Sequence, residues 1–301
     1  MNTPLLDEIE TILPATAWRE RERAHREALT PWICDIRERR ARSLTHPVAD
    51  FLFTYYQYPP GKLERWHPDL HEALEDDGNP PAHFQTAPYI IEGGIVRRDP
   101  ALMTDKVPWR AEWIRNLCHA ILDRPARFAC FGLHEWAMVY RLTPEEIRHA
   151  AYPMRLAPDE LAAFVEEQSL VCTHYDAYRF FTPSARPLNA WFPTLDTRPD
   201  WEQGGCIHAN MDLYKWAYKL MPWLGADLLR ATFLLAAEAR ETDMRASPYD
   251  LRALGYEPIP IETINGRREY EQIQRSLAAK AETLRRQLAL HCEALLKKEW
   301  R

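Results

Sequence analysis

Residues 208–240, HANMDLYKWAYKLMPWLGADLLRATFLLAAEAR, carry apolar side chains at the spacing of two consecutive α-helices. The first helix follows Gly204 and Gly205, and we expect Pro222 to interrupt it because an interior proline removes a backbone donor. A second, alanine-rich helix is predicted from Gly225 to Arg240. This stretch favours a mainly α-helical protein.

The carboxy-terminal segment, GRREYEQIQRSLAAKAETLRRQLALHCEALLKKEW at residues 266–300, has one apolar stripe that includes Ile273, Leu277, Leu284 and Leu288. That spacing predicts a long amphipathic helix. Such a helix packs along its own chain or against a partner helix, and the pattern is the same in both cases.

The amino-terminal residues 16–44 are rich in arginine, with eight Arg against five acidic residues. We expect a helix that begins at Thr16 and is broken near Thr30 and Pro31. One interpretation is a solvated helix with i,i+4 ion pairs, and the other is a local phosphate-binding face.

Aromatic residues crowd the segment VADFLFTYYQY at 48–58, which predicts a helix buried nearly all round and ended by Pro59 and Pro60. The long connection that follows holds a short hairpin around Gly93-Gly94. Further segments complete the middle of the chain: helices at 109–122, 133–141, 144–151 and 158–169, and an extended segment at 171–181.

The resulting fold class is mainly α: a single helical domain with a few short strands and long proline-rich connections. We divide it into an arginine-rich amino-terminal helical segment packed on the body, a catalytic core and a long amphipathic helix. These parts cover residues 1–45, 46–265 and 266–301.

Composition excludes several classes of protein. Of 301 residues, 46% are hydrophobic and 27% are charged, as in globular proteins and unlike disordered or fibrous chains. Only 10 glycines argue against glycine-rich nucleotide loops. A net charge of −6 gives no overall attraction to nucleic acid, so DNA binding would need a local basic face.

The sequence also bears on the compartment. The start, MNTPLLDEIE, lacks a basic region followed by an apolar run, and the longest apolar stretch, around 231–237, is far too short to span a bilayer. Six cysteines form no CxxC pair, which favours reduced, buried thiols over a zinc ribbon. We expect a cytoplasmic protein without membrane contact.

In four segments, ionisable residues occur within otherwise apolar sequence. They are His134 with Glu135, His174 with Asp176 on one face of the predicted extended segment, His208 with Asp212 and Lys215 on a helix, and the helix end that holds Arg240, Glu241, Asp243, Arg245, Tyr249 and Asp250. Burying an unpaired carboxylate costs on the order of several kcal/mol of folding free energy, unless a partner compensates its charge. Each segment alone fits a satisfied polar network, but four together predict that at least two line a common site.

Metal binding is the competing use of these residues, because imidazoles and carboxylates are common metal ligands. None of the spacings is diagnostic, since Glu135 is followed by Trp-Ala-Met and no HExxH occurs. No metal and no cofactor are therefore predicted. The 11 Trp and 13 Tyr are either core residues or stacking walls for a planar base.

Four strings carry a resemblance to a known family: HPVADFLFTYY at 46–56, CFGLHEWAMVYR at 130–141, HANMDLYKWAYKL at 208–220 and DMRASPYDLRALGYEPIPIET at 243–263. Together they resemble a bacterial family of about this length that is commonly labelled 3-methyladenine DNA glycosylase. The similarity runs from His46 to Gly266. The chain shows none of the helix-hairpin-helix, uracil-excising or alkylpurine-repeat patterns of other glycosylases.

The resemblance implies an enzyme that flips a modified base from double-stranded DNA and hydrolyses its N-glycosidic bond, leaving an abasic site. The base is an alkylated purine or a hypermodified base, including one carried by phage DNA, so the role is DNA repair or phage defence. We expect a monomer.

For the carboxylate that stabilises the positive sugar, Asp243 is the first choice, with Asp176 and Glu135 as alternatives. The remaining candidate roles are hypotheses. Base binding is assigned to His134, His174, His208, Tyr178, Asp212, Tyr214, Trp216 and Tyr249, and DNA-phosphate contact to Lys215, Arg240 and Arg245.

Two other classes stay open at this point. One is a metal-dependent hydrolase or oxygenase acting on a small molecule, with its ligands drawn from His134, Glu135, His174, Asp176, His208 and Asp212. The other is a non-catalytic DNA-binding or partner-binding protein that uses the arginine-rich and carboxy-terminal helices.

Overall fold

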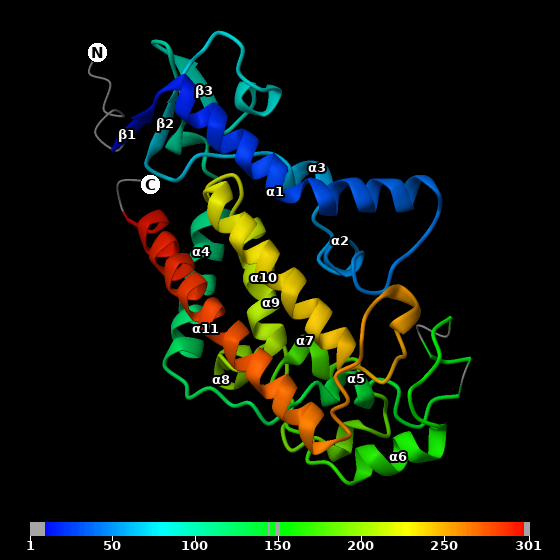
Figure 1. Ribbon diagram of the computed structural model, residues 1–301. Coiled ribbons are helices and arrows are strands. Elements are labelled where there is room, and N and C mark those ends of the chain that lie inside the picture. Colours follow the sequence, from blue (N-terminus) through cyan, green and yellow to red (C-terminus); the bar gives the residue numbers. More distant parts are fainter. Residues whose placement is uncertain (1–9, 144, 148–150, 298–301) are drawn as a thin grey trace. The chain divides into compact units, whose positions relative to one another are not determined.

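A computed structural model describes residues 10–143, 145–147 and 151–297. Over these residues 54% are helical and 7% lie in strands, which confirms the mainly α fold class (Figure 1). Among them, no helix combines the length and the apolar character needed to cross a bilayer.

The chain divides into two compact units. The first comprises Met1–Asn116, Tyr214–Phe233 and Arg286–Arg301, and the second comprises Leu117–Leu213 and Leu234–Arg285. Long helices contribute residues to both: α4 (Lys106–Leu122), α9 (Ile207–Lys219), α10 (Ala226–Arg245) and α11 (Ile264–Leu295). Their existence was predicted from the apolar spacing, and the structure confirms each of them.

The first unit contains a small sheet at the amino-terminal end of α1 (Ala15–Ala41), as Figure 1 shows. Its strands run in the order β1-β2-β4-β3, with β1 parallel to β2 and the other pairs antiparallel. Their bounds are Thr11–Leu13, Glu72–Glu75, Tyr89–Glu92 and Ile95–Arg98 for β1 to β4. The last two strands form the predicted hairpin, because Gly93 and Gly94 adopt the positive φ that its turn requires.

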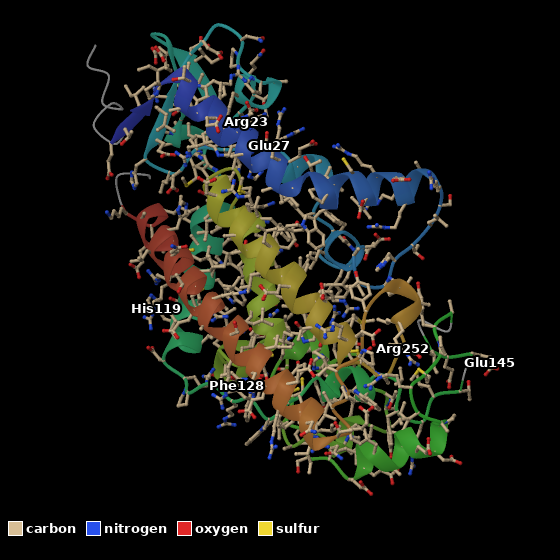
Figure 2. The ribbon with its side chains drawn as sticks, viewed as in Figure 1. Arg23, Glu27, His119, Phe128, Glu145 and Arg252 are labelled. Atoms are coloured by element: carbon tan, nitrogen blue, oxygen red, sulfur yellow. The ribbon has the colours of Figure 1, made fainter. Side chains whose placement is uncertain are left out.

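Helix α1 is continuous, so the predicted break near Pro31 is wrong. A proline costs a helix one hydrogen bond, but Leu29, Ile33 and Ile36 are all buried on one face and hold both halves in line. The arginines are largely paired with acids of the same helix, as Arg23 is with Glu27 (Figure 2). This agrees with the solvated, ion-paired interpretation of the segment.

The predicted helix at 48–58 is much shorter than expected. Only α2 (Phe51–Thr54) is helical there, and α3 (Pro60–Leu63) follows. Gln57 takes a positive φ of 56°, a left-handed conformation that cannot continue a right-handed helix. The aromatic rings are packed instead by stacking, as between Tyr58 and Tyr218 at 4.7 Å.

Among its described residues, the second unit holds four short helices beside its parts of the long ones. They are α5 (Leu133–Ala137), α6 (Pro158–Glu166), α7 (Tyr175–Tyr178) and α8 (Arg198–Trp201). Short 3-10 turns occur elsewhere in the chain at Ala82–Gln85, Pro100–Leu102, Arg186–Leu188 and Arg252–Leu254.

Two predictions for the second unit are corrected. The helix expected at 133–141 ends at Ala137, and Arg141 lies in the left-handed region. No residue of 171–181 lies in a strand, and α7 starts directly after His174, so the predicted strand is wrong. The helix expected at 144–151 falls partly on residues 144 and 148–150, which lie outside the described part of the chain.

Candidate functional site

A cavity of about 290 Å³ lies in the second unit. Its lining combines aromatic, imidazole and thiol side chains, with a short loop at its rim. The residues are Arg127, Phe128, Ala129, Cys130, His134, Val171, Cys172, Thr173, Trp191, Gln203, Cys206, Ile207, His208, Tyr270 and Gln274. The volume lies at the lower end of the roughly 300–1,000 Å³ that small-molecule sites occupy.

The rim is held by close backbone contact between Arg127 and Gly205. A Cβ atom on Gly205 would lie 2.3 Å from the carbonyl oxygen of Arg127, so only glycine fits there. Gln203 joins the same two segments, because its Oε1 accepts from the backbone N–H groups of Arg127 and Gly205 at 2.8 and 2.7 Å. The exposed Arg127 side chain is thereby anchored at its backbone.

An ion-paired cluster is built around His134, a residue of the cavity lining. Nε2 of His134 donates to Oδ1 of Asp243 at 2.7 Å, and both side chains are almost fully buried. Arg240 donates to the other oxygen of Asp243 at 3.2 Å and to Glu135 at 2.9 Å. Helix α5 supplies His134 and Glu135, and α10 supplies Arg240 and Asp243. The structure thus brings together two of the predicted segments.

The charges of this cluster follow from burial and pairing. Burial disfavours an imidazolium, but the Asp243 carboxylate outweighs it and raises the pKa of His134 well above its ordinary value. Burial would also raise the pKa of Asp243, yet His134 holds it below its usual range. Burial raises the pKa of Glu135 against the pull of Arg240. Asp243 is therefore ionised at neutral pH.

His208 on α9 lies next to this pair but remains neutral. Its ring centroid is 4.4 Å from that of His134, and its Nε2 is 3.9 Å from Oδ2 of Asp243. Burial and then the charge of His134 lower the pKa of His208 to about 3. A neutral imidazole can donate from one nitrogen and accept at the other.

Three residues of the lining leave a buried polar atom without a hydrogen-bond partner among the described residues. These atoms are Nδ1 of His208, the hydroxyl of Tyr270 and Oε1 of Gln274. The Gln274 amide is oriented unambiguously, since its Nε2 donates to the carbonyl of Gly205 at 2.6 Å. Buried polar atoms are nearly always satisfied, so these three favour a polar ligand or ordered water in the cavity.

A second buried network surrounds Arg198 of α8. Its guanidinium donates to Glu202 and Asp212 at 2.6 Å each and to Asp176 at 3.1 Å. His174 lies 3.3 Å from Asp212. The His174 ring stacks on that of His208 at 5.5 Å, so the two networks meet. This places His174, Asp176 and Asp212 in one cluster beside the cavity residue His208.

Ligating atoms of His134, His208 and Asp243 lie within 4.8 Å of one another, close enough to surround a metal ion. Two contacts oppose that use. Nε2 of His134 and Oδ1 of Asp243 are already bonded to each other, and Arg240 brings a positive charge to the second carboxylate oxygen. An imidazolium also has no free lone pair for a metal. The arrangement is better explained as a hydrogen-bonded acid–imidazole pair.

The other predicted residues of the second unit lie outside the cavity lining. Tyr178 packs against Phe181 and Phe192. Tyr249 is buried and pairs with Met154 in an isolated β-bridge. Arg245 donates to the carbonyl of Glu257 at 2.8 Å. Arg240 is only 3% exposed, which makes it a part of the buried cluster.

Three predicted residues of α9 belong to the first unit. Tyr214 packs edge-on against Tyr56, Tyr58 and Phe233. Trp216 contacts Trp113 at 4.8 Å, and the ammonium group of Lys215 lies 4.5 Å from the Trp216 ring centroid. These rings form an aromatic core of their own.

Sequence reasoning missed several residues of the site. Cys130, Tyr270 and Gln274 line the cavity, and Arg198 and Glu202 organise the second network. Gln274 follows Tyr270 by four residues within the apolar stripe of α11, and this polar residue inside a buried face was a visible clue. Arg198 lies in a proline-rich stretch of sequence without apolar periodicity, which gives no clue to its burial in α8.

No protein-family model, curated protein or solved structure matches this chain.

Proposed function

We propose that the protein is a DNA glycosylase that accepts a modified base into the cavity of the second unit and hydrolyses its N-glycosidic bond. The observation that carries this proposal is a cavity of about 290 Å³ whose lining holds two imidazoles, His134 and His208, next to the buried, ionised Asp243. The resemblance of four sequence segments to the 3-methyladenine glycosylase family supports the same reaction class.

The walls of the cavity suit a flat heterocycle. Phe128, Trp191 and Tyr270 offer aromatic surface for stacking. Gln274 offers an acceptor, and Tyr270 and His208 offer groups that donate or accept. A flipped base presents ring faces and a polar edge, and this lining can satisfy both.

The charge of the cluster suits the chemical step. As the base departs with the electrons of the C1′–N bond, the sugar gains positive charge, and water then adds at C1′. Asp243 does not line the cavity, and its carboxylate lies 2.7 Å from Nε2 of His134 and 3.9 Å from Nε2 of His208, which do. In the resting cluster His134 and Arg240 compensate this charge, and it becomes available to the positive sugar when His134 passes a proton to the departing base.

The charge of the departing base determines whether the protein must also supply a proton. A cationic alkylated purine leaves as a neutral molecule, whereas a neutral hypermodified base requires a proton. The His134–Asp243 pair stabilises an imidazolium at the cavity, which supports proton donation toward such a base. Alkylated purines and hypermodified bases of phage DNA are therefore both included.

Contact with the DNA backbone would be local. The exposed Arg127 stands at the rim, and the Arg275 guanidinium lies 4.1 Å from the ring centroid of Phe128, which is labelled in Figure 2. Two arginines beside the opening can contact phosphates although the net charge is −6.

The test uses duplex DNA that is methylated, hypermodified or unmodified. We expect free base and alkali-labile abasic sites from one of the modified substrates only. His208→Gln should reduce release by about tenfold or more, since removal of a positioned polar group costs this much or more in rate. His119→Gln, at an exposed position of α4 labelled in Figure 2, is the matched control and should behave like the wild type. If no substrate yields abasic sites, the proposal fails.

A further inference from the structure

Cys130 stands at the cavity as the first member of a chain of three side chains. Its Sγ lies 3.5 Å from Nδ1 of His134, within hydrogen-bond range for sulfur. The other ring nitrogen, Nε2, donates to Asp243 at 2.7 Å. A thiol, an imidazole beside it and a carboxylate that orients the imidazole form this pattern in enzymes that use a thiol.

The backbone holds the thiol and the imidazole in register. Between them, Phe131 and Gly132 take positive φ angles of 47° and 76°, and the N–H of Leu133 donates to the carbonyl of Cys130 at 2.9 Å. A phenylalanine rarely adopts this left-handed conformation, so the turn is fixed by its surroundings. This left-handed turn ends where α5 begins at Leu133, and it brings the Cys130 side chain to the His134 ring.

The other cavity thiols lack this arrangement. Burial raises the pKa of Cys172 and of Cys206. Cys172 donates weakly to the carbonyl of His174 at 3.7 Å. Cys130 is only partly buried, so a small molecule can reach it.

We propose that Cys130 is a nucleophilic thiol that forms a covalent bond with an electrophilic carbon of a small ligand in the cavity. The ligand class is a compact molecule whose carbon bears a good leaving group, such as an alkyl carbon on a positively charged ring nitrogen. Three unpartnered polar atoms in the same lining, on His208, Tyr270 and Gln274, indicate that the cavity receives a polar ligand. This activity does not depend on base excision.

The step balances in atoms and charge. Asp243 holds His134 as an imidazolium through Nε2, and the Nδ1–H of that ring stabilises the sulfur of Cys130 as a thiolate once the thiol proton has passed to solvent. The sulfur then forms a bond to the carbon, and the bond from that carbon to the leaving group breaks with its electron pair. A cationic ring nitrogen becomes neutral, and His134 keeps its proton.

Iodoacetamide tests the proposal with the full chain and no DNA. Iodide is the leaving group, and peptide mass spectrometry follows the alkylation of each cysteine over time. The exposed Cys34 is the internal reference. A positioned acid–base side chain contributes on the order of 10²-fold or more, so with the His134 imidazolium beside its sulfur we expect Cys130 to react at least about tenfold faster than Cys34. Equal or slower alkylation of Cys130 overturns the proposal, whatever the variants show.

A variant pair tests the role of the imidazole. His134→Gln should slow Cys130 by about tenfold or more and leave the rate at Cys34 unchanged, while His119→Gln should change neither rate. The buried Cys118 and Cys292 report on folding, because they become alkylated only if the chain opens. A folded His134→Gln protein with an undiminished rate at Cys130 contradicts the proposal. If that variant does not fold, the comparison of Cys130 with Cys34 in the wild type decides.

Discussion

Replacing Asp243 by asparagine tests the buried cluster and the proposed reaction together. The two side chains have nearly the same shape, so the substitution removes the negative charge and adds no bulk. His134 then loses the carboxylate that bonds it at 2.7 Å, and Arg240 loses the one at 3.2 Å. Asp243 has no exposed surface, so water cannot replace the lost interactions.

The free energy of unfolding should fall substantially. Breaking a buried ion pair costs about 3–5 kcal/mol, because it leaves an uncompensated charge in the interior. We expect the lower end, about 3 kcal/mol, since Arg240 keeps Glu135 at 2.9 Å and His134 can release its proton. Domains are commonly stable by about 5–15 kcal/mol, so the variant should remain folded at 25 °C.

The rate of base release should fall by about 10²-fold or more, the usual cost of removing one fixed electrostatic group from an active site. Urea unfolding gives the stability, and release of free base from modified duplex DNA gives the rate. Asp227→Asn is the matched control on the same helix. Asp227 is 42% exposed in its ion pair with Arg21, and such pairs contribute about 0–1 kcal/mol.

Two results would refute this reasoning. If the free energy of unfolding of Asp243→Asn lay within about 1 kcal/mol of that of Asp227→Asn, Asp243 would not compensate buried charge. An undiminished rate in a folded variant would show that its charge does not stabilise the sugar. If Glu135→Gln or Asp176→Asn alone abolished release, another carboxylate would hold the role and the reaction class would stand.

Three further predictions concern the rim, the pH dependence and metal ions. Gly205→Ala should slow base release, because its Cβ would lie 2.3 Å from the Arg127 carbonyl oxygen. Gly204→Ala has open space around its Cβ and should leave the rate of base release unchanged. Equal rates for the two variants would show that the contact between Gly205 and Arg127 does not matter for base release. Burial lowers the pKa of His25 and of His67, so the unfolded chain takes up protons first as the pH falls below about 6.5. Each histidine then lowers the free energy of unfolding by up to about 1.4 kcal/mol per pH unit. An equal free energy of unfolding in urea at pH 5.5 and at pH 7.5 would contradict this. Base release should survive a chelator, and loss of activity that returns with zinc, iron or manganese would instead support the metal-dependent class.

Helix existence was predictable where the apolar spacing ran for several turns. The helices around 207–219, 226–245 and 264–295 bury one face along their length, and apolar residues at helical spacing mark that face in the sequence. Short elements were not predictable in this way. In 171–181 the alternation of residues predicts a strand, but one turn of helix forms at 175–178, where Asp176 is bonded by Arg198. Long-range contacts decide such segments.

The site was predictable in its residue types and only partly in its members. Buried imidazoles and carboxylates in apolar text indicated His134, His208 and Asp243, because such groups need partners. The sequence could not show that Cys130 belongs with them. Its contact with His134 needs a left-handed turn at Phe131, which no pattern of residue types predicts.

The two buried networks link the stability of the fold to the proposed site. Asp243 serves one network and Arg198 the other, and they meet at the stacked rings of His174 and His208. Each charge is tolerated in the interior only while its partners remain. A substitution in either network is therefore expected to lower the free energy of unfolding and to disturb His134 or His208 of the cavity lining. A loss of activity identifies a catalytic group here only when an isosteric variant is shown to be folded and a control on the same helix is active.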